Sequence, residues 1–558
     1  MEKRVTRVRF APSPTGPLHM GGVRTALYNY LYAKQQGGVF VLRIEDTDSQ
    51  RFVPGAEKYI IESLKWCNIL PTEGIDKEGN VVEKSSAEHP FAPYRQSQRK
   101  AIYRKYAEQL IASGDAYYAF DTPEELEASR NKAEANHSTF IYNYQNRNQL
   151  KNSLTISADK VEQLLKDTNH WTIRFKIPEG QTVVMDDLIR GHMEVETNTL
   201  DDKVLWKAAD ELPTYHLANI VDDHLMEITD VIRGAEWLPS LPLHYLLYKA
   251  FGWQDSQPRF AHLSLLLKPD GKGKLSKRDG DRLGFPVFPL KWVSQTGETS
   301  RGYREDGYYP EAFVNMLALL GWNPGTEQEI FTLDELSKAF SFDRVIKSGA
   351  KFNPEKAKWF NEQYLRARTA KQLAVEFLPV LQKKAADAMA SSEMSCSGGT
   401  TKQDATSDLK YITQICDLIK ERAHFVNDFW DISKSIFIPP VNYDIQDISK
   451  FCKPEIKPCM EKMLEHINAT QFEDYLSGAE KAEDIDAYKA QCCNKIEGML
   501  TGFINENGWK MGSIMNTMRL FFTGTTRGLG IADLIYFMGK EEAVKRIEKG
   551  ITNTFQQI

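Results

Sequence analysis

Hydrophobic and polar positions follow two different periods along residues 5–70 of the chain. Residues 5–10, VTRVRF, alternate between apolar and polar as in a strand, and residues 39–46, VFVLRIED, form the next strand-like run. Residues 21–38 and 55–70 show helical spacing, and the Gly37-Gly38 pair gives the first of these helices a C-terminal stop. Strand, helix, strand and helix in this order predict a parallel, doubly wound α/β sheet.

The pattern changes after Pro93. Residues 95–120 show helical spacing and residues 121–200 are mixed and polar, which is typical of a segment inserted into the first domain. Strand-like segments resume near Thr214, most clearly in ITDVIRG and FAHLSLLL, and helical patterns dominate from about Thr332 onward. We predict an α/β domain in two halves (1–93 and 201–331), an inserted domain (94–200), a helical domain (332–384), a linker of small polar residues (385–408) and a second helical domain (409–558).

Composition narrows the class of protein. A chain of 558 residues with 42% hydrophobic content can bury a core in each of several domains. The net charge of −6 excludes a globally cationic surface, so nucleic acid must be bound by local patches. The seven cysteines form no CxxC pair, which is typical of reduced thiols in a cytoplasmic protein. The opening MEKRVTRVRF lacks the apolar core of a signal peptide, and no apolar run approaches about 18 residues, so we expect a soluble protein that is not exported.

The stretch RFAPSPTGPLHMGG, residues 9–22, connects the first strand to the first helix. A strand that leaves its sheet through a glycine-containing turn places backbone N–H groups and the positive end of a helix at one point, which favours an anion such as phosphate. The motif is neither a GxxxxGK[ST] loop nor a GxGxxG loop. His19 stands at the expected helix start, where its ring can face the same anion. A strand-to-helix turn with an incidental histidine remains the alternative.

A second stretch, KPDGKGKLSKRDG, concentrates five basic residues between Lys268 and Gly280. Such a loop is commonly a solvated surface. Here, however, Lys274 and Lys277 flank Leu275-Ser276 in the pattern of a phosphate-binding loop. HMGG together with KLSKR resembles the two signature motifs of class I aminoacyl-tRNA synthetases.

The surrounding stretches narrow the resemblance to bacterial-type glutamyl-tRNA synthetases. They are RFAPSPTGPLHMGG, LRIEDTD, RFVPGAE, PYRQSQR, PTYHLANIVDDHLMEITDVIRGAEWL, KLSKR and, near the C-terminus, MGSIMNTMRLFFTGTTRGLGIADLIYFMGKEEAVKRI. The similarity follows most of the chain in order and is weak in residues 120–170, 283–303 and 385–500. The resemblance implies a Rossmann-type catalytic domain, an inserted domain that binds the tRNA acceptor end, a helical domain that contacts the stem and a helical anticodon-binding domain.

The implied reaction has two steps. The carboxylate of L-glutamate attacks the α-phosphate of ATP to give glutamyl-adenylate and pyrophosphate, and the 2′-OH at the 3′ end of tRNA(Glu) then attacks the activated carbonyl. Such chemistry needs positioning and neutralisation of negative charge more than a covalent participant. Mg²⁺ is expected with ATP, and the family default is a cytoplasmic monomer.

The resemblance also implies roles for individual residues. His19 and Lys277 are the expected catalytic residues. The expected ATP-binding residues are His19, Gly21, Gly22, Lys274, Ser276 and Lys277. The expected glutamate-binding residues are Arg9, Ala11, Ser13, Glu45, Tyr215, Asn219 and Arg233, among which the arginines suit a dicarboxylic substrate. Arg422, in LIKERAHFVNDF, matches an anticodon-reading arginine, and an ordinary surface arginine is the alternative there.

Three features depart from the family pattern. Gly22 occupies the position where much of the class has a second histidine. No cysteine lies between Cys67 and Cys396, so we expect none of the structural zinc that some relatives carry in the inserted domain. Residues 281–301 form an extra piece after KLSKR, and the sequence leaves its role open.

Other functions stay open at this point. An enzyme that also glutamylates tRNA(Gln), a glutaminyl-tRNA synthetase, a glutamyl transferase that modifies a tRNA base and a non-catalytic RNA-binding descendant are the alternatives. The helical C-terminal half argues against the transferase, and intact His19, Lys277, Arg9, Arg233 and Glu45 argue against the non-catalytic protein. The sequence also leaves open whether adenylate formation requires tRNA.

Overall fold

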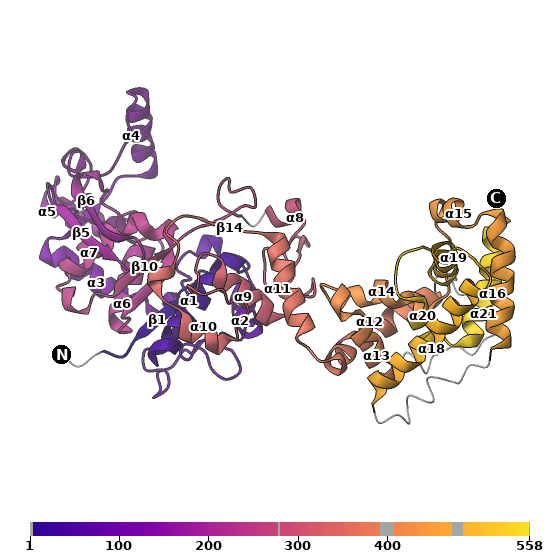
Figure 1. The fold of residues 1–558 in the computed structure, drawn as a ribbon. Helices are drawn as coiled ribbons and strands as arrows, with labels where there is room; N and C mark the ends of the chain where they lie inside the picture. The colour runs from indigo at the N-terminus through magenta and orange to yellow at the C-terminus, as the bar shows by residue number, and fades with distance from the viewer. Residues whose placement is uncertain (1–3, 277–278, 391–406, 471–483, 557–558) are drawn as a thin grey trace. The chain divides into compact units, whose positions relative to one another are not determined.

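The computed structural model describes residues 4–276, 279–390, 407–470 and 484–556, and these form two compact units, Met1–Phe360 and Asn361–Ile558 (Figure 1). Of the predicted linker, residues 385–390 continue helix α12 (Ala370–Ala390), and residues 391–406 lie outside the described residues. The predicted domain boundaries remain predictions. Among the described residues, no helix combines the length and the apolar character that crossing a membrane requires.

A six-stranded sheet organises the first unit. Its order is β2-β1-β9-β10-β5-β6, formed by β2 (Val39–Leu42), β1 (Arg7–Phe10), β9 (Asp230–Gly234), β10 (Arg259–Leu263), β5 (Thr182–Asp187) and β6 (Gly191–Glu196). All neighbours pair in parallel except β5 and β6, which form an antiparallel hairpin. The predicted doubly wound parallel sheet is therefore confirmed. All four residues of β1 are buried, as expected of a strand with both faces covered.

Helices cross between the parallel strands. Helix α1 (Met20–Gln36) connects β1 to β2 and ends at Gly37, whose φ of 60° is the left-handed value that glycine adopts at a helix C-terminus. Helix α6 (Tyr215–Leu225) leads into β9, and α7 (Leu241–Ala250) connects β9 to β10. Because these crossovers return the chain to the same edge of the sheet each time, residues from distant segments meet where the parallel strands end.

The segment between the two halves of the sheet has a sheet of its own. It is a four-stranded antiparallel sheet, β3-β4-β7-β8, formed by β3 (Ala116–Ala119), β4 (Thr172–Phe175), β7 (Val204–Lys207) and β8 (Leu212–Pro213). Strands β5 and β6 also fall within residues 94–200, yet they extend the six-stranded sheet. Strand β5 alternates between exposed and buried positions, as expected of a strand with one face turned to solvent.

The remaining elements of the first unit are mostly helical. Between β2 and β5 the chain forms the helices α2 (Ala56–Trp66), α3 (Lys100–Ser113), α4 (Pro123–Ala135) and α5 (Ala158–Asp167). After β10 it forms β11 (Leu266–Leu267), α8 (Asp279–Leu283), β12 (Trp292–Val293), β13 (Thr299–Ser300), α9 (Pro310–Leu319), α10 (Leu333–Ala339), β14 (Ala350–Lys351) and α11 (Pro354–Arg366), whose residues from Asn361 onward belong to the second unit. In the extra piece, β12 and β13 form a short hairpin, and the Trp292 ring meets that of Tyr59 edge-on with centroids 5.2 Å apart.

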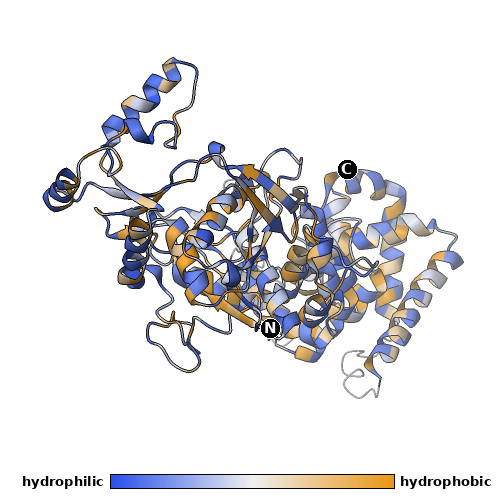
Figure 2. Ribbon diagram, turned by 90° about the vertical axis from the view of Figure 1, so that its left-hand side faces the viewer, coloured by the Kyte–Doolittle hydropathy of each residue, from blue (hydrophilic) through white to orange (hydrophobic). Residues whose placement is uncertain are grey.

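The second unit is helical throughout its described residues. After α12 its helices are α13 (Leu409–Ile419), α14 (Asp428–Phe437), α15 (Ile445–Phe451), α16 (Lys457–Ala469), α18 (Ile485–Glu506), α19 (Met511–Thr523), α20 (Ile531–Met538) and α21 (Lys540–Thr554). Apolar residues such as Met460, Ile496 and Phe521 are buried between them, and the ribbon coloured by hydropathy shows helices with one apolar and one polar side (Figure 2). The expected helical C-terminal region is thus confirmed.

Candidate active site

Two adjoining pockets open where the parallel strands end. The first, which we call the charged pocket, is lined by Arg9, Ala11, Ser13, Glu45, Tyr215, Asn219 and Arg233, the whole set expected to bind glutamate. The second, the helix-start pocket, is lined by His19, Gly21, Gly22, Lys274 and Ser276, which were expected to bind ATP. His19, Gly22 and Glu236 line both pockets, so the two are continuous. Lys277 lies outside the described residues.

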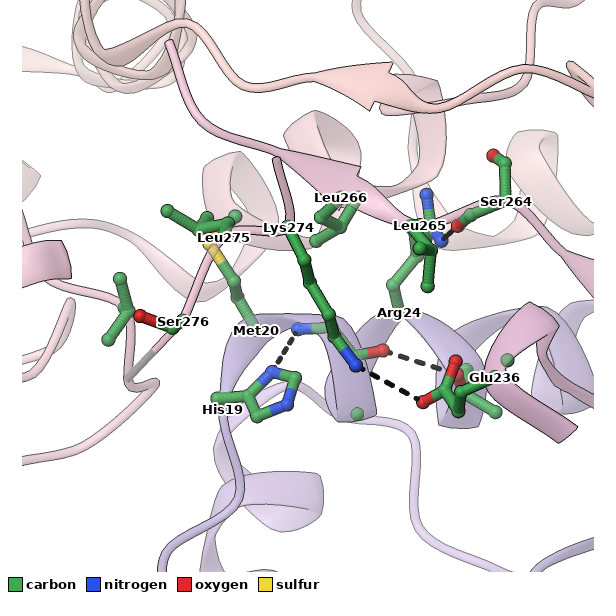
Figure 3. A pocket seen from close by; sticks show the side chains of 15 residues that line it. His19, Met20, Arg24, Glu236, Ser264, Leu265, Leu266, Lys274, Leu275 and Ser276 are labelled. Carbon is green, nitrogen blue, oxygen red and sulfur yellow. Dashed lines mark hydrogen bonds and ion pairs between the residues drawn. The ribbon is translucent and has the colours of Figure 1, made fainter. Parts of the chain in front are cut away.

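His19 caps the start of α1. Its Nδ1 accepts the N–H of Gly21 at 2.9 Å, so the ring folds back over the first turn of the helix (Figure 3). A Cβ on Gly21 would lie 2.7 Å from Cε1 of this ring, so only glycine leaves room for the contact. The N–H of Met20 donates to the carbonyl of Val287, in the extra piece, at 2.8 Å. The sequence predicted free N–H groups at this helix start, whereas these two already have partners within the chain.

Lys274 reaches across the helix-start pocket from its loop. Its Nζ lies 3.7 Å from the carboxylate of Glu236, which follows β9 (Figure 3). Arg24, which also lines this pocket, is buried and donates to the carbonyls of Leu320 and Ser264. Burial lowers the pKa of Arg24. Among the described residues that line it, the pocket therefore carries two cations beside a single exposed carboxylate, which suits an anionic ligand.

The loop around Ser276 is held by Asp279. The Ser276 hydroxyl and backbone N–H donate to the Asp279 carboxylate at 2.6 and 2.9 Å, and the Lys268 ammonium lies 3.3 Å from its other oxygen. The hydrogen bonds from Ser276, followed by the lysine charge, keep the pKa of Asp279 well below its usual value. The backbone on either side of residues 277–278 is thus tied to a carboxylate that stays ionised.

Arg9 and Glu45 in the charged pocket belong to a buried ion network that the sequence did not reveal. Arg9 contacts Asp223 at 3.1 and 3.3 Å, and Arg43 contacts the same carboxylate at 2.7 Å and Glu45 at 3.0 Å. The amide of Asn219 lies 3.3 Å from Glu45. Both Arg43 and Asp223 fall within stretches that carry the resemblance, LRIEDTD and IVDDH, but only the fold shows that they are buried together.

Asp222 and Arg99 extend this ion network beyond the residues that line the pocket. Asp222 accepts from Arg99 at 2.8 Å and lies 3.8 Å from Arg43. Although burial alone would raise it, the charges of Arg9 and Arg43 hold the pKa of Asp223 below its usual value, whereas burial prevails at Glu45 and raises its pKa. Within this network Arg9, Arg43 and Arg99 face three buried carboxylates, Glu45, Asp222 and Asp223, so its charges balance among the described residues.

Arg233 differs from the other arginines because its partners are uncharged. Its guanidinium donates to the Tyr215 hydroxyl at 2.9 Å, to Nε2 of His262 at 2.9 Å and to the Trp237 carbonyl at 3.4 Å. The ring of Trp237 stacks on that of Tyr215 with centroids 4.0 Å apart. Among the described residues, no carboxylate lies within 4.0 Å of this guanidinium. Its charge is therefore available to a carboxylate that enters the pocket.

Arg422 belongs to the second unit. It closes a short helical turn after α13, and its guanidinium donates to the carbonyl of Gly528 at 3.1 Å. An anticodon-reading role for it stays a prediction. Within the part of the chain that the structure describes, no group of three or more His, Cys, Asp or Glu could hold a metal ion.

Comparison with known proteins agrees with this geometry. Residues 5–359 match the catalytic domain of the class I tRNA synthetases for glutamate and glutamine (E and Q), and residues 372–551 match an anticodon-binding domain. The chain is 51% identical over 546 residues to a glutamate–tRNA ligase of Christiangramia forsetii, covering 98% of each chain. It is 51% identical over 552 residues to a glutamate–tRNA ligase of Flavobacterium johnsoniae, covering 99% of this chain and 100% of that one. A crystal structure of a glutamate tRNA ligase from Elizabethkingia meningosepticum, in complex with its amino acid, matches 99% of this chain and 100% of its own with a TM-score of 0.83 and 46% identity.

Proposed function

The chain belongs to the class I tRNA synthetases for glutamate and glutamine, and from this membership we propose that it ligates L-glutamate to the 3′ end of tRNA(Glu), with ATP as co-substrate, through glutamyl-adenylate. The observation that carries the proposal is the continuity of two pockets with different charge patterns. One has cations and a carboxylate for an amino acid that bears two carboxylates and an ammonium group. The other has a histidine-capped helix start and a lysine loop for phosphates.

Glutamate binds in the charged pocket. The uncompensated guanidinium of Arg233, with Arg9, receives its carboxylates, and Glu45 accepts its ammonium group. Tyr215 and Asn219 complete the contacts, and Ala11 and Ser13 form the wall contributed by the turn after β1. Selection against glutamine follows because arginine presents N–H donors alone, which match a carboxylate and oppose an amide NH₂ group.

ATP binds in the helix-start pocket, so that its α-phosphorus lies beside the glutamate carboxylate. A carboxylate oxygen forms the new bond to phosphorus as the bond to pyrophosphate breaks, and the 2′-OH of the tRNA end then displaces AMP from the carbonyl carbon. His19, Lys274 and Lys277 stabilise the charge that spreads over the phosphates, while Gly21, Gly22 and Ser276 provide close approach and hydrogen bonds. Mg²⁺ enters as the complex with ATP.

Two contacts in the helix-start pocket must give way to ATP. The phosphates compete with Glu236 for Lys274, and a phosphate oxygen that accepts the N–H of Gly21 displaces the ring of His19. The freed ring and ammonium group can then follow the charge as it develops. Interactions that form at this stage lower the barrier rather than merely tighten ground-state binding.

The remaining parts bind tRNA. Residues 94–200, which contribute strands β3 and β4 to the separate antiparallel sheet, take the acceptor end, residues 332–384 the stem, and residues 409–558 the anticodon, with Arg422 at the base-reading position. We expect a cytoplasmic monomer.

Aminoacylation by the purified protein tests the proposal. With ATP and Mg²⁺, we expect labelled glutamate to be attached to tRNA(Glu) and labelled glutamine to be attached to neither tRNA(Glu) nor tRNA(Gln). Glutamate on both tRNAs would identify an enzyme that also glutamylates tRNA(Gln). Glutamine on tRNA(Gln) without glutamate on tRNA(Glu) would overturn the proposal in favour of a glutaminyl-tRNA synthetase.

A further inference from the structure

Behind Arg233 lies a pair of buried side chains, Asp187 and His262, that the proposed reaction has not yet used. Asp187 ends β5 and His262 lies in β10, where it is paired directly with Arg233 of β9. Oδ2 of Asp187 lies 2.6 Å from Nδ1 of His262, and Nε2 of His262 accepts from Nε of Arg233 at 2.9 Å. The exposed fractions are 4% for Asp187 and 0% for His262, so this pair is sealed from water, while Arg233, also 4% exposed, lines the charged pocket.

This arrangement fixes how His262 carries its proton. Asp187 is an acceptor alone when ionised, so Nδ1 of His262 must bear the hydrogen that lies between them. Nε2 is then left with a lone pair, which is what the donating Nε–H of Arg233 requires. Burial lowers the pKa of His262, which keeps the imidazole neutral. If the imidazole were protonated, or if its hydrogen were on Nε2, the N–H at Nε2 would face the Nε–H of Arg233 and neither group could accept.

We propose that Asp187 and His262 are positioning residues for substrate selection, which orient the Arg233 guanidinium toward the side-chain carboxylate of glutamate without neutralising its charge. The inference rests on the proposed function and deepens it by naming what makes the site specific for the acidic side chain. A carboxylate in direct contact with Arg233 would also orient it, but it would compete with the substrate for the same charge. A neutral imidazole orients it and leaves the charge to the ligand. The Asp187 carboxylate, which fixes the imidazole, contacts His262 rather than Arg233.

A second neutral imidazole, that of His244, also lies beside the Arg233 guanidinium. Nδ1 of His244, on α7, lies 3.3 Å from the guanidinium of Arg233, and His244 is fully buried. Nε2 of the same ring lies 3.4 Å from His216. Burial, followed by the charge of Arg233, lowers the pKa of His244 well below its usual value. Arg233 is thus held between two neutral rings, which is the environment that an uncompensated cation with a fixed orientation needs.

The structure predicts how the Asp187→Asn substitution acts. Oδ1 of Asp187 accepts the backbone N–H groups of Ile189 and Arg190 at 2.9 and 2.8 Å. An asparagine at this position keeps its amide oxygen there, since its NH₂ group cannot accept those bonds, and this turns the NH₂ group toward Nδ1 of His262. The imidazole must then present its lone pair at Nδ1 and its hydrogen at Nε2, facing the Nε–H of Arg233. An Asp→Asn change in the catalytic triad of serine proteases reverses the histidine tautomer in the same way.

The test compares Michaelis constants in ATP–pyrophosphate exchange with tRNA(Glu) present. We expect Asp187→Asn and His262→Leu to raise the KM for glutamate about 10- to 100-fold, the range expected for one lost hydrogen bond to a charged group, and to change the KM for ATP less than about twofold. His262→Gln, whose amide oxygen can accept from Arg233, should recover most of the glutamate affinity. In the His262→Gln background, Asp187→Asn should have little further effect because an amide has no tautomer to fix.

Asp230→Asn is the matched control. Asp230 is also a buried carboxylate of this sheet, 1% exposed and 2.6 Å from Arg259, but it lies at the opposite end of β9 from Arg233, and both its Michaelis constants should stay at the wild-type values. Equal changes in the two Michaelis constants, a His262→Gln variant as impaired as His262→Leu, or an unchanged glutamate KM in Asp187→Asn would each overturn the proposal. Failure of the wild-type protein to activate glutamate would instead overturn the proposed function, so the two failures are distinguishable.

Discussion

Replacing Asp223 by asparagine removes the charge on which two buried arginines converge. The carboxylate contacts Arg9 at 3.1 Å and Arg43 at 2.7 Å, and the three side chains are no more than 3% exposed. The amide is nearly the same size as the carboxylate, so packing is preserved and the loss is electrostatic. Arg43 and Arg9 are then left with Glu45, which lies 3.0 Å from Arg43, as the nearest remaining carboxylate of the pocket.

The magnitude follows from burial. Removing one partner of a buried ion pair costs about 3–5 kcal/mol, because the remaining charge cannot be solvated. We therefore expect Asp223→Asn to lower the stability of the sheet by about that amount. It should also raise the KM for glutamate at least about tenfold, since Glu45 is drawn toward the arginines and away from the substrate ammonium group.

Hydrogen–deuterium exchange of peptides that contain β1 and β2 measures the first effect directly. Asp334→Asn is the matched control, because Asp334 forms a pair of similar length with Lys34, at 2.5 Å, but is 71% exposed. An exposed pair contributes at most about 1 kcal/mol, so exchange in this control should barely change. If β1 and β2 exchange equally in the two variants, the buried network does not stabilise the sheet and the reasoning is refuted.

Three further outcomes are expected. Lys277→Ala should abolish adenylate formation, measured by ATP–pyrophosphate exchange, and leave tRNA affinity in a filter-binding assay nearly unchanged; near-normal charging would remove Lys277 from the chemistry. Arg233→Gln should raise the KM for glutamate far more than that for ATP, and an unchanged glutamate KM would exclude Arg233 from the pocket. Burial lowers the pKa of His216 from 6.5 to about 4, so the unfolded chain binds this proton more readily than the folded one. Stability should therefore fall as the pH drops from about 6.5 to 4, by about 1.4 kcal/mol per pH unit for this group, and urea titrations at several pH values should show less of that fall in His216→Gln.

Much of the fold could be predicted from the periodicity of the chain. Strands at residues 7–10 and 39–42 with a helix between them were visible because alternating and helical patterns are local properties. Strands β5 and β6 were not placed in the main sheet. Their pairing joins residues that are far apart in sequence, Asp187 with Phe260, and no local pattern specifies such a partner.

For the candidate site, too, some residues could be predicted from local motifs and others could not. Motifs near the start of α1 and around KLSKR pointed to the residues that line the helix-start pocket, because short motifs carry their own geometry. The same motifs suggested free N–H groups at that helix start, and the structure shows that Met20 donates to Val287, more than two hundred residues away. Arg43, Asp223 and His262 were missed because residue type alone does not show which polar side chains are buried.

By itself, the sequence determined which side chains are present and the order in which strands, turns and helices follow one another. It also carried the resemblance that points to glutamate, ATP and tRNA. Only the tertiary structure decided which charges are paired: Arg9 is neutralised by Asp223 from a helix 214 residues away, while Arg233 is held by a histidine of the neighbouring strand. The physical reason is that a parallel sheet gathers the ends of distant strands at one edge, where burial and register, rather than residue type, decide which arginine remains available to the substrate.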